Sequence, residues 1–170
     1  MQGEIEVIEA VALPRVECPE GGGERCPRCV SMCAERPGWP TVREAEALLD
    51  AGYGGRLMLD WWVMLSTPDD VYVLSPAFIG REGRYATERP EGRCTFLTRE
   101  GLCELHEVGK PLECAVADCR WEERTEERKV AVARMKAGIV GDWSGEAGRA
   151  LVARWKREVG LEEEGSDDEG

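Results

Sequence analysis

Cys26–Cys33 reads CPRCVSMC and places three cysteines within eight residues (the first cysteine segment). Cys94–Cys119 reads CTFLTREGLCELHEVGKPLECAVADC and holds four more (the second cysteine segment). Some sixty residues without cysteine separate them, and Cys18 precedes the first segment across the glycine-rich lead PEGGGER. Two dense groups of thiols on one chain indicate a chemical role for these cysteines, and their number allows two zinc sites, one four-cysteine cluster with spare thiols, or two clusters.

The chain is long enough to build its own hydrophobic core. Its 170 residues are typical of one domain, so neither metals nor disulfides are needed to replace a missing core. A content of 42% apolar and 33% charged residues is that of a soluble globular protein. The richest apolar run, Leu57–Leu65, is too short for a membrane helix and contains Asp60. We therefore expect no membrane insertion.

The N-terminal sequence predicts the cellular compartment of the protein and therefore the redox state of its cysteines. MQGEIEVIEAVALPRVE carries glutamates where a secretory signal has basic residues, which predicts a cytoplasmic protein. A reducing cytoplasm disfavours persistent disulfides. Eight cysteines then indicate metal, cluster or redox chemistry. For a single isolated cysteine, burial as a small hydrophobic side chain is the alternative.

The charge of the chain excludes one class of partner. A net charge of −12 argues against nucleic-acid binding, which depends on basic residues that neutralise phosphates. Half of this charge lies in the tail Leu161–Gly170, LEEEGSDDEG, which has six acidic and no basic residues. Such a segment cannot bury enough apolar surface to become ordered. The sequence predicts one domain over residues 1–160, followed by a disordered tail. The tail is expected to act as a solubilising end, with docking to a basic partner protein as the alternative, and the oligomeric state is open.

Helical patterns flank the region between the cysteine segments. Thr41 and Glu44 form a capping box, followed by an apolar stripe at Ala45, Leu48 and Leu49 and a stop near Gly52. Further helices are predicted from Trp121 to about Val140 and from Ser144, as N-cap, to Val159, with Gly160 at its end. One face of the first of these carries Thr125, Val132, Met135 and Ile139.

Short extended segments complete the prediction. Leu57–Leu65 is a buried helix or strand with Trp61 and Trp62 in the core, and VYVLSP is a short strand that ends at Pro76. Residues 80–93 are rich in glycine and charge and predict a loop. The predicted fold is small, single-domain and mainly α, an α+β class with a few short strands and irregular, metal-organised loops.

The spacing of the cysteines suits a metal. Cys26 and Cys29 form a C-x2-C pair, the shortest spacing from which two thiolates reach one ion, and Cys33 follows within one turn of chain. Cys103 and His106 form a C-x2-H pair within the second segment. A zinc site with mixed ligands would use His106, whereas an iron–sulfur cluster prefers four cysteines and leaves it outside.

The order C-x2-C-x3-C, then C-x-F-L, G-x-C-x-L-H and K-P-x-x-C-x4-C, resembles a cysteine-cluster family described as a zinc- or iron-chelating domain (YkgJ-type). The resemblance spans Cys26–Cys119 and extends to the cysteine domain of flagellin lysine methylases. Carried over residue by residue, it implies seven ligands: Cys26, Cys29, Cys33, Cys94, Cys103, Cys114 and Cys119. Met32 stands where the family has an adjacent cysteine, and Lys110 replaces its arginine, so Cys18 is a candidate for the missing thiolate.

The cofactor that the resemblance favours is an iron–sulfur cluster, of the [4Fe–4S] type, with zinc as the alternative. The first segment runs opposite to the C-x3-C-x2-C order of radical S-adenosylmethionine enzymes. Phosphate loops, a thioredoxin-type setting and hydrolase triads also have no match. We expect a cytoplasmic metal-binding protein for electron transfer, metal handling or partner docking. The alternative is a cluster-dependent protein-modifying enzyme, such as a lysine methylase.

Overall fold

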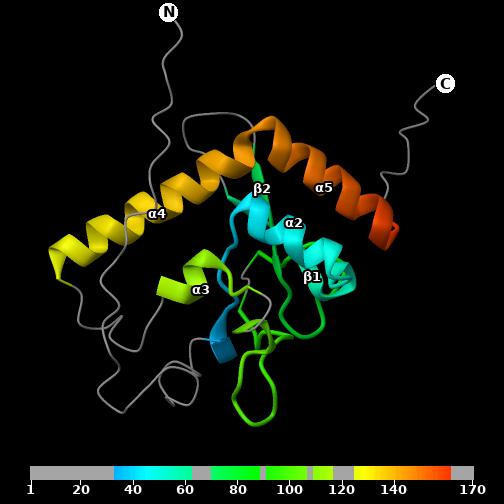
Figure 1. The fold of residues 1–170 in the computed structure, drawn as a ribbon, viewed down its shortest axis with the longest axis horizontal. Helices are drawn as coiled ribbons and strands as arrows, with labels where there is room; N and C mark the ends of the chain where they lie inside the picture. The colour runs from blue at the N-terminus through cyan, green and yellow to red at the C-terminus, as the bar shows by residue number, and fades with distance from the viewer. Residues whose placement is uncertain (1–32, 63–69, 89–90, 107–108, 117–124, 162–170) are drawn as a thin grey trace, which may run out of the picture.

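The computed structural model describes residues 33–62, 70–88, 91–106, 109–116 and 125–161. Its elements in chain order are α2 (Val42–Asp50), η2 (Gly54–Arg56), β1 (Leu57–Trp62), β2 (Val71–Pro76), η3 (Glu104–His106), α3 (Leu112–Val116), α4 (Glu126–Ser144) and α5 (Glu146–Val159). The strands pair antiparallel, from Leu57 opposite Pro76 to Trp62 opposite Val71. Figure 1 shows this small α+β fold, which confirms the predicted class.

Three helices cover the hairpin of β1 and β2. α4 and α5 contact each other and β2, and α2 contacts both helices beneath the bend where they meet (Figure 1). Three tryptophans, Trp39, Trp143 and Trp155, lie at the centre with at most 1% of their surface exposed. The Trp143 indole donates to the Pro40 carbonyl at 2.8 Å, and the Trp155 indole to the Gly54 carbonyl at 2.9 Å. The core therefore satisfies the polar atoms of its large side chains.

The first predicted helix is confirmed. Thr41 Oγ1 accepts the Glu44 amide at 3.3 Å, and Glu44 Oε2 accepts the Thr41 amide at 2.8 Å, which completes the capping box. Ala45, Leu48 and Leu49 are the buried stripe. The local sequence decides this helix because its cap and its apolar face agree.

The bend between α4 and α5 differs from the prediction. Ser144 is the last residue of α4 and its hydroxyl donates to the Gly141 carbonyl, while Gly145 occupies the N-cap of α5. A Cβ on Gly148 would come within 2.4 Å of the Trp143 carbonyl oxygen, so the chain turns tightly here. Ser144 as N-cap was wrong because this close packing, rather than the best capping side chain, sets where the bend lies.

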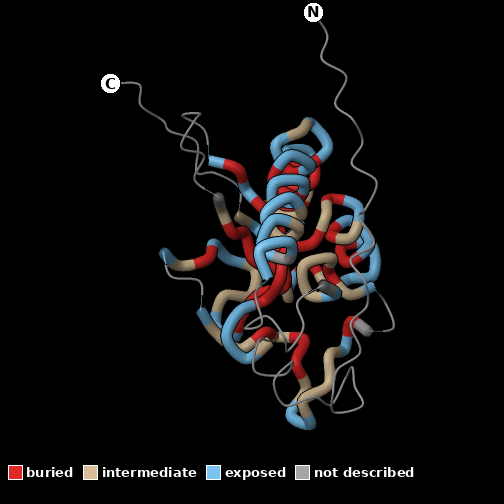
Figure 2. Tube along the Cα trace, turned by 90° about the vertical axis from the view of Figure 1, so that its left-hand side faces the viewer, coloured by how far each residue is buried: buried red, intermediate tan, exposed pale blue. Residues whose placement is uncertain are grey.

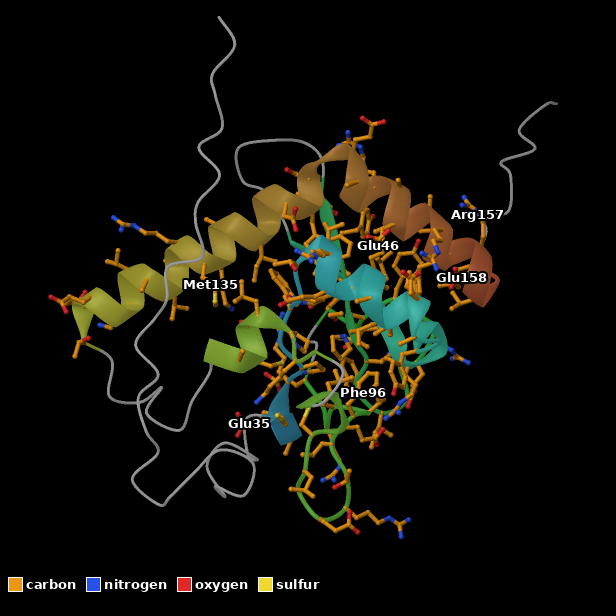
Figure 3. All side chains as sticks on the ribbon, in the orientation of Figure 1. Glu35, Glu46, Phe96, Met135, Arg157 and Glu158 are labelled. Atoms are coloured by element: carbon orange, nitrogen blue, oxygen red, sulfur yellow. The ribbon has the colours of Figure 1, made fainter. Side chains whose placement is uncertain are left out.

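α4 is buried only along its second half. Ile139 is 2% exposed and Met135 packs against the core from the side of α4 that faces α3 (Figure 3). Thr125 is exposed, so the predicted face begins later than the sequence pattern indicates. The turns of α4 nearest the viewer in Figure 2 are coloured as exposed. Residues 121–124 lie outside the described residues.

The segment Leu57–Leu65 was predicted to be a buried helix or strand. The structure shows a strand over Leu57–Trp62, and residues 63–65 lie outside the described residues. Trp61 is half-buried against a small cluster of Met58, Ala77, Phe78 and Ala86. Residues 80–88 and 91–93 form a loop, as predicted. Within the described part of the chain, no helix has both the length and the apolar character that crossing a membrane requires.

The C-terminal end of α5 is as predicted, with Val159 as the last helical residue and Gly160 as its cap. Gly160 adopts φ +74°, its amide bonds the Arg157 carbonyl at 3.3 Å, and the Leu161 amide bonds the Lys156 carbonyl at 2.8 Å. This pair of bonds is a Schellman motif. Leu161 packs against the core, so it belongs with the folded residues; residues 162–170 lie outside the described residues.

Truncation tests this boundary. Ending the chain after Leu161 is expected to leave the free energy of unfolding unchanged, whereas Leu161→Ala in the full chain should lower it by about 1 kcal/mol, because the apolar contact that closes the motif is lost. Urea unfolding of both variants measures this. A loss of similar size on removing residues 162–170 alone would show that the acidic tail stabilises the domain.

Candidate metal centre

The two cysteine segments meet through backbone hydrogen bonds. The Cys94 amide donates to the Cys33 carbonyl at 2.9 Å, and the Gly92 amide donates to the Glu35 carbonyl at 2.7 Å. Cys94 also forms an antiparallel bridge with Phe78. The end of the first segment is thus fixed alongside the start of the second, although some sixty residues separate them in sequence.

Cys103 reaches the same region through a tight turn. An antiparallel bridge joins it to Leu97, with the Thr98 amide donating to the Leu102 carbonyl at 2.8 Å and the Glu104 amide to the Phe96 carbonyl at 2.9 Å. Cys94 and Cys103 therefore lie on the two arms of one small loop. Cys94 is 7% exposed and belongs to the main core, against which Cys33 and Cys103 also pack.

Cys114 comes from α3 and is held by the segment before α2. Its Sγ accepts the Gly38 amide at 3.2 Å. A Cβ on Gly38 would lie 2.6 Å from that sulfur and 2.8 Å from the Cys114 nitrogen, so only glycine allows this approach. The next residue, Trp39, donates its amide to Glu113 Oε2 at 2.8 Å, and the Glu113 amide donates to the Trp39 carbonyl at 3.3 Å.

The electrostatics of the thiols place them in one neighbourhood. Burial, with smaller contributions from the nearby Cys33 and Cys103 thiols, raises the pKa of the Cys94 thiol to about 12. Burial also raises the pKa of Cys114 well above its usual range, with Cys33 and Cys94 adding to the rise. Without a cation these buried thiols stay protonated, whereas a bound metal ion favours the thiolate.

Backbone N–H groups bond both of the most buried sulfurs. Phe96 supplies the hydrogen bond to Cys94, and Gly38 supplies the hydrogen bond to Cys114; each lowers the pKa of its thiol against the larger effect of burial. Amide donors that point at cysteine sulfur are the outer interactions that orient and tune thiolate ligands of a metal.

Two cations stand near these sulfurs. Arg56 lowers the pKa of Cys94, and Lys110 lowers that of Cys114. The Arg56 guanidinium lies 4.0 Å from the centroid of the Phe96 ring and bonds the Thr95 carbonyl at 2.5 Å and Glu104 at 2.7 Å. The bond from Arg56 holds the pKa of Glu104 below its usual value. Positive groups beside several thiolates reduce the cost of their mutual repulsion.

The predicted ligands divide into two groups. The structure brings Cys33, Cys94, Cys103 and Cys114 into one neighbourhood, and Cys94, Cys103 and Cys114 are reduced thiols. Among the described residues, no three Cys, His, Asp or Glu side chains stand at the spacing of a metal site. Cys18, Cys26, Cys29 and Cys119 lie outside the described residues, as does the side chain of His106.

The donor set nevertheless fits a soft metal in kind. Four sulfurs, two from loops and two from short helical segments, are the type of ligand that zinc and iron–sulfur clusters share, and two of them are largely removed from water. The amide donors at two sulfurs and the two nearby cations suit a centre whose thiolates carry excess negative charge. Cysteines buried only as small hydrophobic side chains need neither feature.

Sequence reasoning gave no role to Gly38, Phe96 or Arg56, the residues around the sulfurs, although Phe96 stands in the C-x-F-L motif. One signal for Gly38 was present, because RPGWP places it between two prolines, a setting for a tight approach of backbone. Nothing local marked Arg56, since its partners Thr95, Phe96 and Glu104 lie some forty to fifty residues away.

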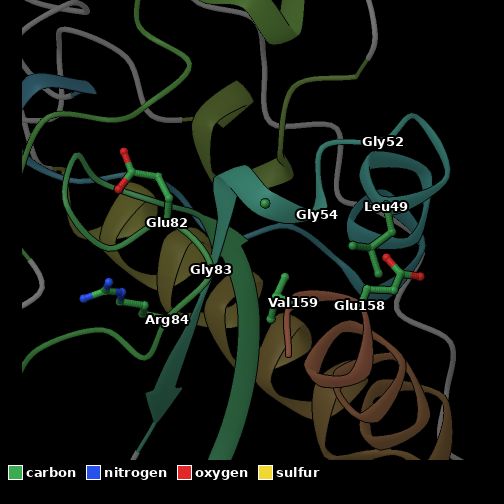
Figure 4. Close-up of a pocket in the computed structure, with 9 residues that line it drawn as sticks. Leu49, Gly52, Gly54, Glu82, Gly83, Arg84, Glu158 and Val159 are labelled. Atoms are coloured by element: carbon green, nitrogen blue, oxygen red, sulfur yellow. The ribbon is translucent and has the colours of Figure 1, made fainter. Parts of the chain in front are cut away.

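A shallow groove of about 500 Å³ lies elsewhere, between the end of α5 and the loop after β2 (Figure 4). No cysteine lines it; its walls are four glycines, the apolar Leu49 and Val159, and the charged Glu82, Arg84 and Glu158. Its carboxylates are already engaged, because Glu82 accepts the Gly80 amide at 2.7 Å and Glu158 pairs with Arg154 at 2.8 Å. The groove therefore has no residue in common with the proposed cysteine site.

Comparison with known proteins gave no match. No model of a protein family, no curated protein sequence and no solved structure matches it. The resemblance to the cysteine-cluster family therefore stays a prediction from the sequence, and the functional argument rests on the geometry of the thiols.

Proposed function

We propose that this chain is a metal-binding protein in which cysteines of both segments hold one centre, an iron–sulfur cluster or, alternatively, zinc. The observation that carries the proposal is the meeting of the segments: Cys33 and Cys94 are joined through their backbones, and Cys103 and Cys114 share their neighbourhood. Such a centre supplies electron transfer, metal handling or a docking structure for a partner protein.

Four described cysteines match the number of thiolates that one cluster or one zinc ion takes. They come from three different parts of the chain, so closing them on one ion would link the segment before α2, the loop after β2 and α3. Binding energy of this kind stabilises the fold directly. Cys26, Cys29 and Cys119 complete the seven ligands that the family resemblance implies, with Cys18 as an eighth candidate, or these cysteines serve a second centre.

The preference for iron rests on the resemblance to the cysteine-cluster family and to the flagellin lysine methylases, and the ligand type is compatible with it. All four described donors are cysteines, the set that an iron–sulfur cluster favours. Four-cysteine sites also bind zinc tightly, and zinc refills a site from which oxygen has removed a cluster. Which metal the purified protein contains is therefore expected to depend on whether oxygen was present during its preparation.

Anaerobic purification tests the proposal. Protein prepared without oxygen is expected to be brown, to contain iron with an equal amount of acid-labile sulfide, and to lose its broad visible absorption on reduction with dithionite. The same protein purified in air should be colourless and carry zinc. Stoichiometric zinc without sulfide under strict anoxia would favour the zinc form, and protein that binds neither metal in either preparation would overturn the proposal.

A further inference from the structure

Asp60 is a buried carboxylate that was not among the residues predicted for the metal site. It lies on β1 with 3% of its surface exposed. Its Oδ2 accepts the Trp39 indole at 2.8 Å and Arg36 at 3.0 Å, and its Oδ1 accepts the Trp61 amide at 2.9 Å. Burying a carboxylate costs desolvation free energy unless it is paired. These hydrogen bonds therefore fix the positions of Asp60 and of its partners relative to each other.

The partners of Asp60 belong to the segment that contacts Cys114. Arg36 and Trp39 flank Gly38, whose amide donates to the Cys114 sulfur at 3.2 Å. From the other side Glu113 receives the Trp39 amide, and Lys136 of α4 pairs with the second oxygen of Glu113 at 2.9 Å. The position of the Gly38 amide is therefore fixed from β1, through Asp60, and from α4, through Glu113.

We propose that Asp60 is a positioning residue for the metal centre: by holding Arg36 and Trp39 it aims the Gly38 amide at the Cys114 sulfur and so sets the electron density on that ligand. The inference rests on the proposed function. A hydrogen bond to a thiolate withdraws charge from sulfur, which changes its bond to a metal and the redox potential of a cluster. The same hydrogen bond also stabilises the thiolate form of Cys114, which favours Cys114 as a metal ligand over a thiol that accepts no hydrogen bond.

Asp60→Asn tests the step that positions the amide. The asparagine keeps an acceptor for the Trp39 indole but loses the charge that holds Arg36. In metal-free protein, hydrogen exchange of the Gly38 amide is expected to become about tenfold faster, the factor for one weakened hydrogen bond of this strength, while amides of α5 keep their rates. In protein loaded with Co²⁺, the thiolate-to-cobalt absorption should move to longer wavelength, because a sulfur without its donor gives up charge more easily.

Asp142→Asn is the matched control. Asp142 accepts the amide of Val42, the first residue of α2, at 2.7 Å, so this variant also weakens a carboxylate bond to the backbone close to Gly38 in sequence, but it does not reach Gly38. It should lower stability without moving the cobalt absorption or the exchange of Gly38. Equal spectral changes in both variants would reduce Asp60 to a structural residue and overturn the inference.

Gly38→Ala approaches the same bond from the other side and is useful if Asp60→Asn folds poorly. Its methyl group would meet the Cys114 sulfur at 2.6 Å, so the sulfur must move and Co²⁺ should bind at least about tenfold more weakly. Unchanged affinity would contradict the role of this contact. A wild-type chain that gives no cobalt–thiolate absorption would overturn the proposed function and this inference together; normal absorption that Asp60→Asn does not alter would overturn the inference alone.

Discussion

Replacing Cys94 with serine is expected to abolish metal binding and to lower the free energy of unfolding of the metal-loaded protein by about 5 kcal/mol or more. Structural metal binding contributes roughly 10 kcal/mol to folding in small sites, against a typical net stability of about 5–15 kcal/mol. Cys94 is 7% exposed and is bonded to Cys33 through its backbone, so its sulfur has little freedom to be replaced by another ligand. Metal analysis and urea unfolding measure the two effects.

The same substitution at Cys33, Cys103 or Cys114 should remove the same metal if one centre is shared. Ala77→Ser is the matched control, because Ala77 is fully buried and its carbonyl accepts the Thr95 amide beside Cys94. It adds a buried hydroxyl next to the site without removing a sulfur, and it should keep the full metal content. If each cysteine variant lost only half of the metal, two independent centres would be the better description.

Replacing Trp155 with alanine is expected to cost about 4 kcal/mol without changing the ratio of metal to protein. Trp155 is 0% exposed, and its indole donates to the Gly54 carbonyl at 2.9 Å. Removal of such a side chain leaves a large cavity, for which about 3–5 kcal/mol is usual, and leaves a carbonyl without its donor. Thermal unfolding should show a midpoint lower by about 10 °C, since a chain of this size shifts by roughly 2–4 °C for each kcal/mol.

Trp155→Phe separates the two contributions. It keeps most of the buried ring and loses the hydrogen bond, so a loss of about 1–2 kcal/mol is expected. A cost below about 1 kcal/mol for Trp155→Ala would show that α5 is not anchored through this side chain. Loss of metal in either variant would show that the core formed by α5 and the cysteine neighbourhood fold as one unit rather than separately.

Local sequence was sufficient wherever the decisive interactions lie within a few residues. The capping box of Thr41 and Glu44, the stripe of α2 and the left-handed Gly160 after α5 were all readable, because each depends on neighbours in the chain. Ser144 failed as an N-cap since the bend it was assigned to is set by Gly148 packing on Trp143. Leu57–Trp62 was ambiguous until its pairing partner Val71–Pro76 was in place, because strand formation depends on a second segment.

The sequence by itself was enough to predict a chemistry: seven of the eight cysteines lie in two dense segments, which predicts metal binding, and the acidic charge argues against nucleic-acid binding. Only the tertiary structure decided which thiols become neighbours, since Cys33 and Cys94 meet through one backbone bond between residues sixty-one apart. It alone revealed that Gly38, Phe96 and Arg56 surround the sulfurs and that Asp60 holds the segment bearing Gly38. The physical reason is range: residue type sets what a side chain can bind, whereas packing of distant segments sets what lies within reach of it.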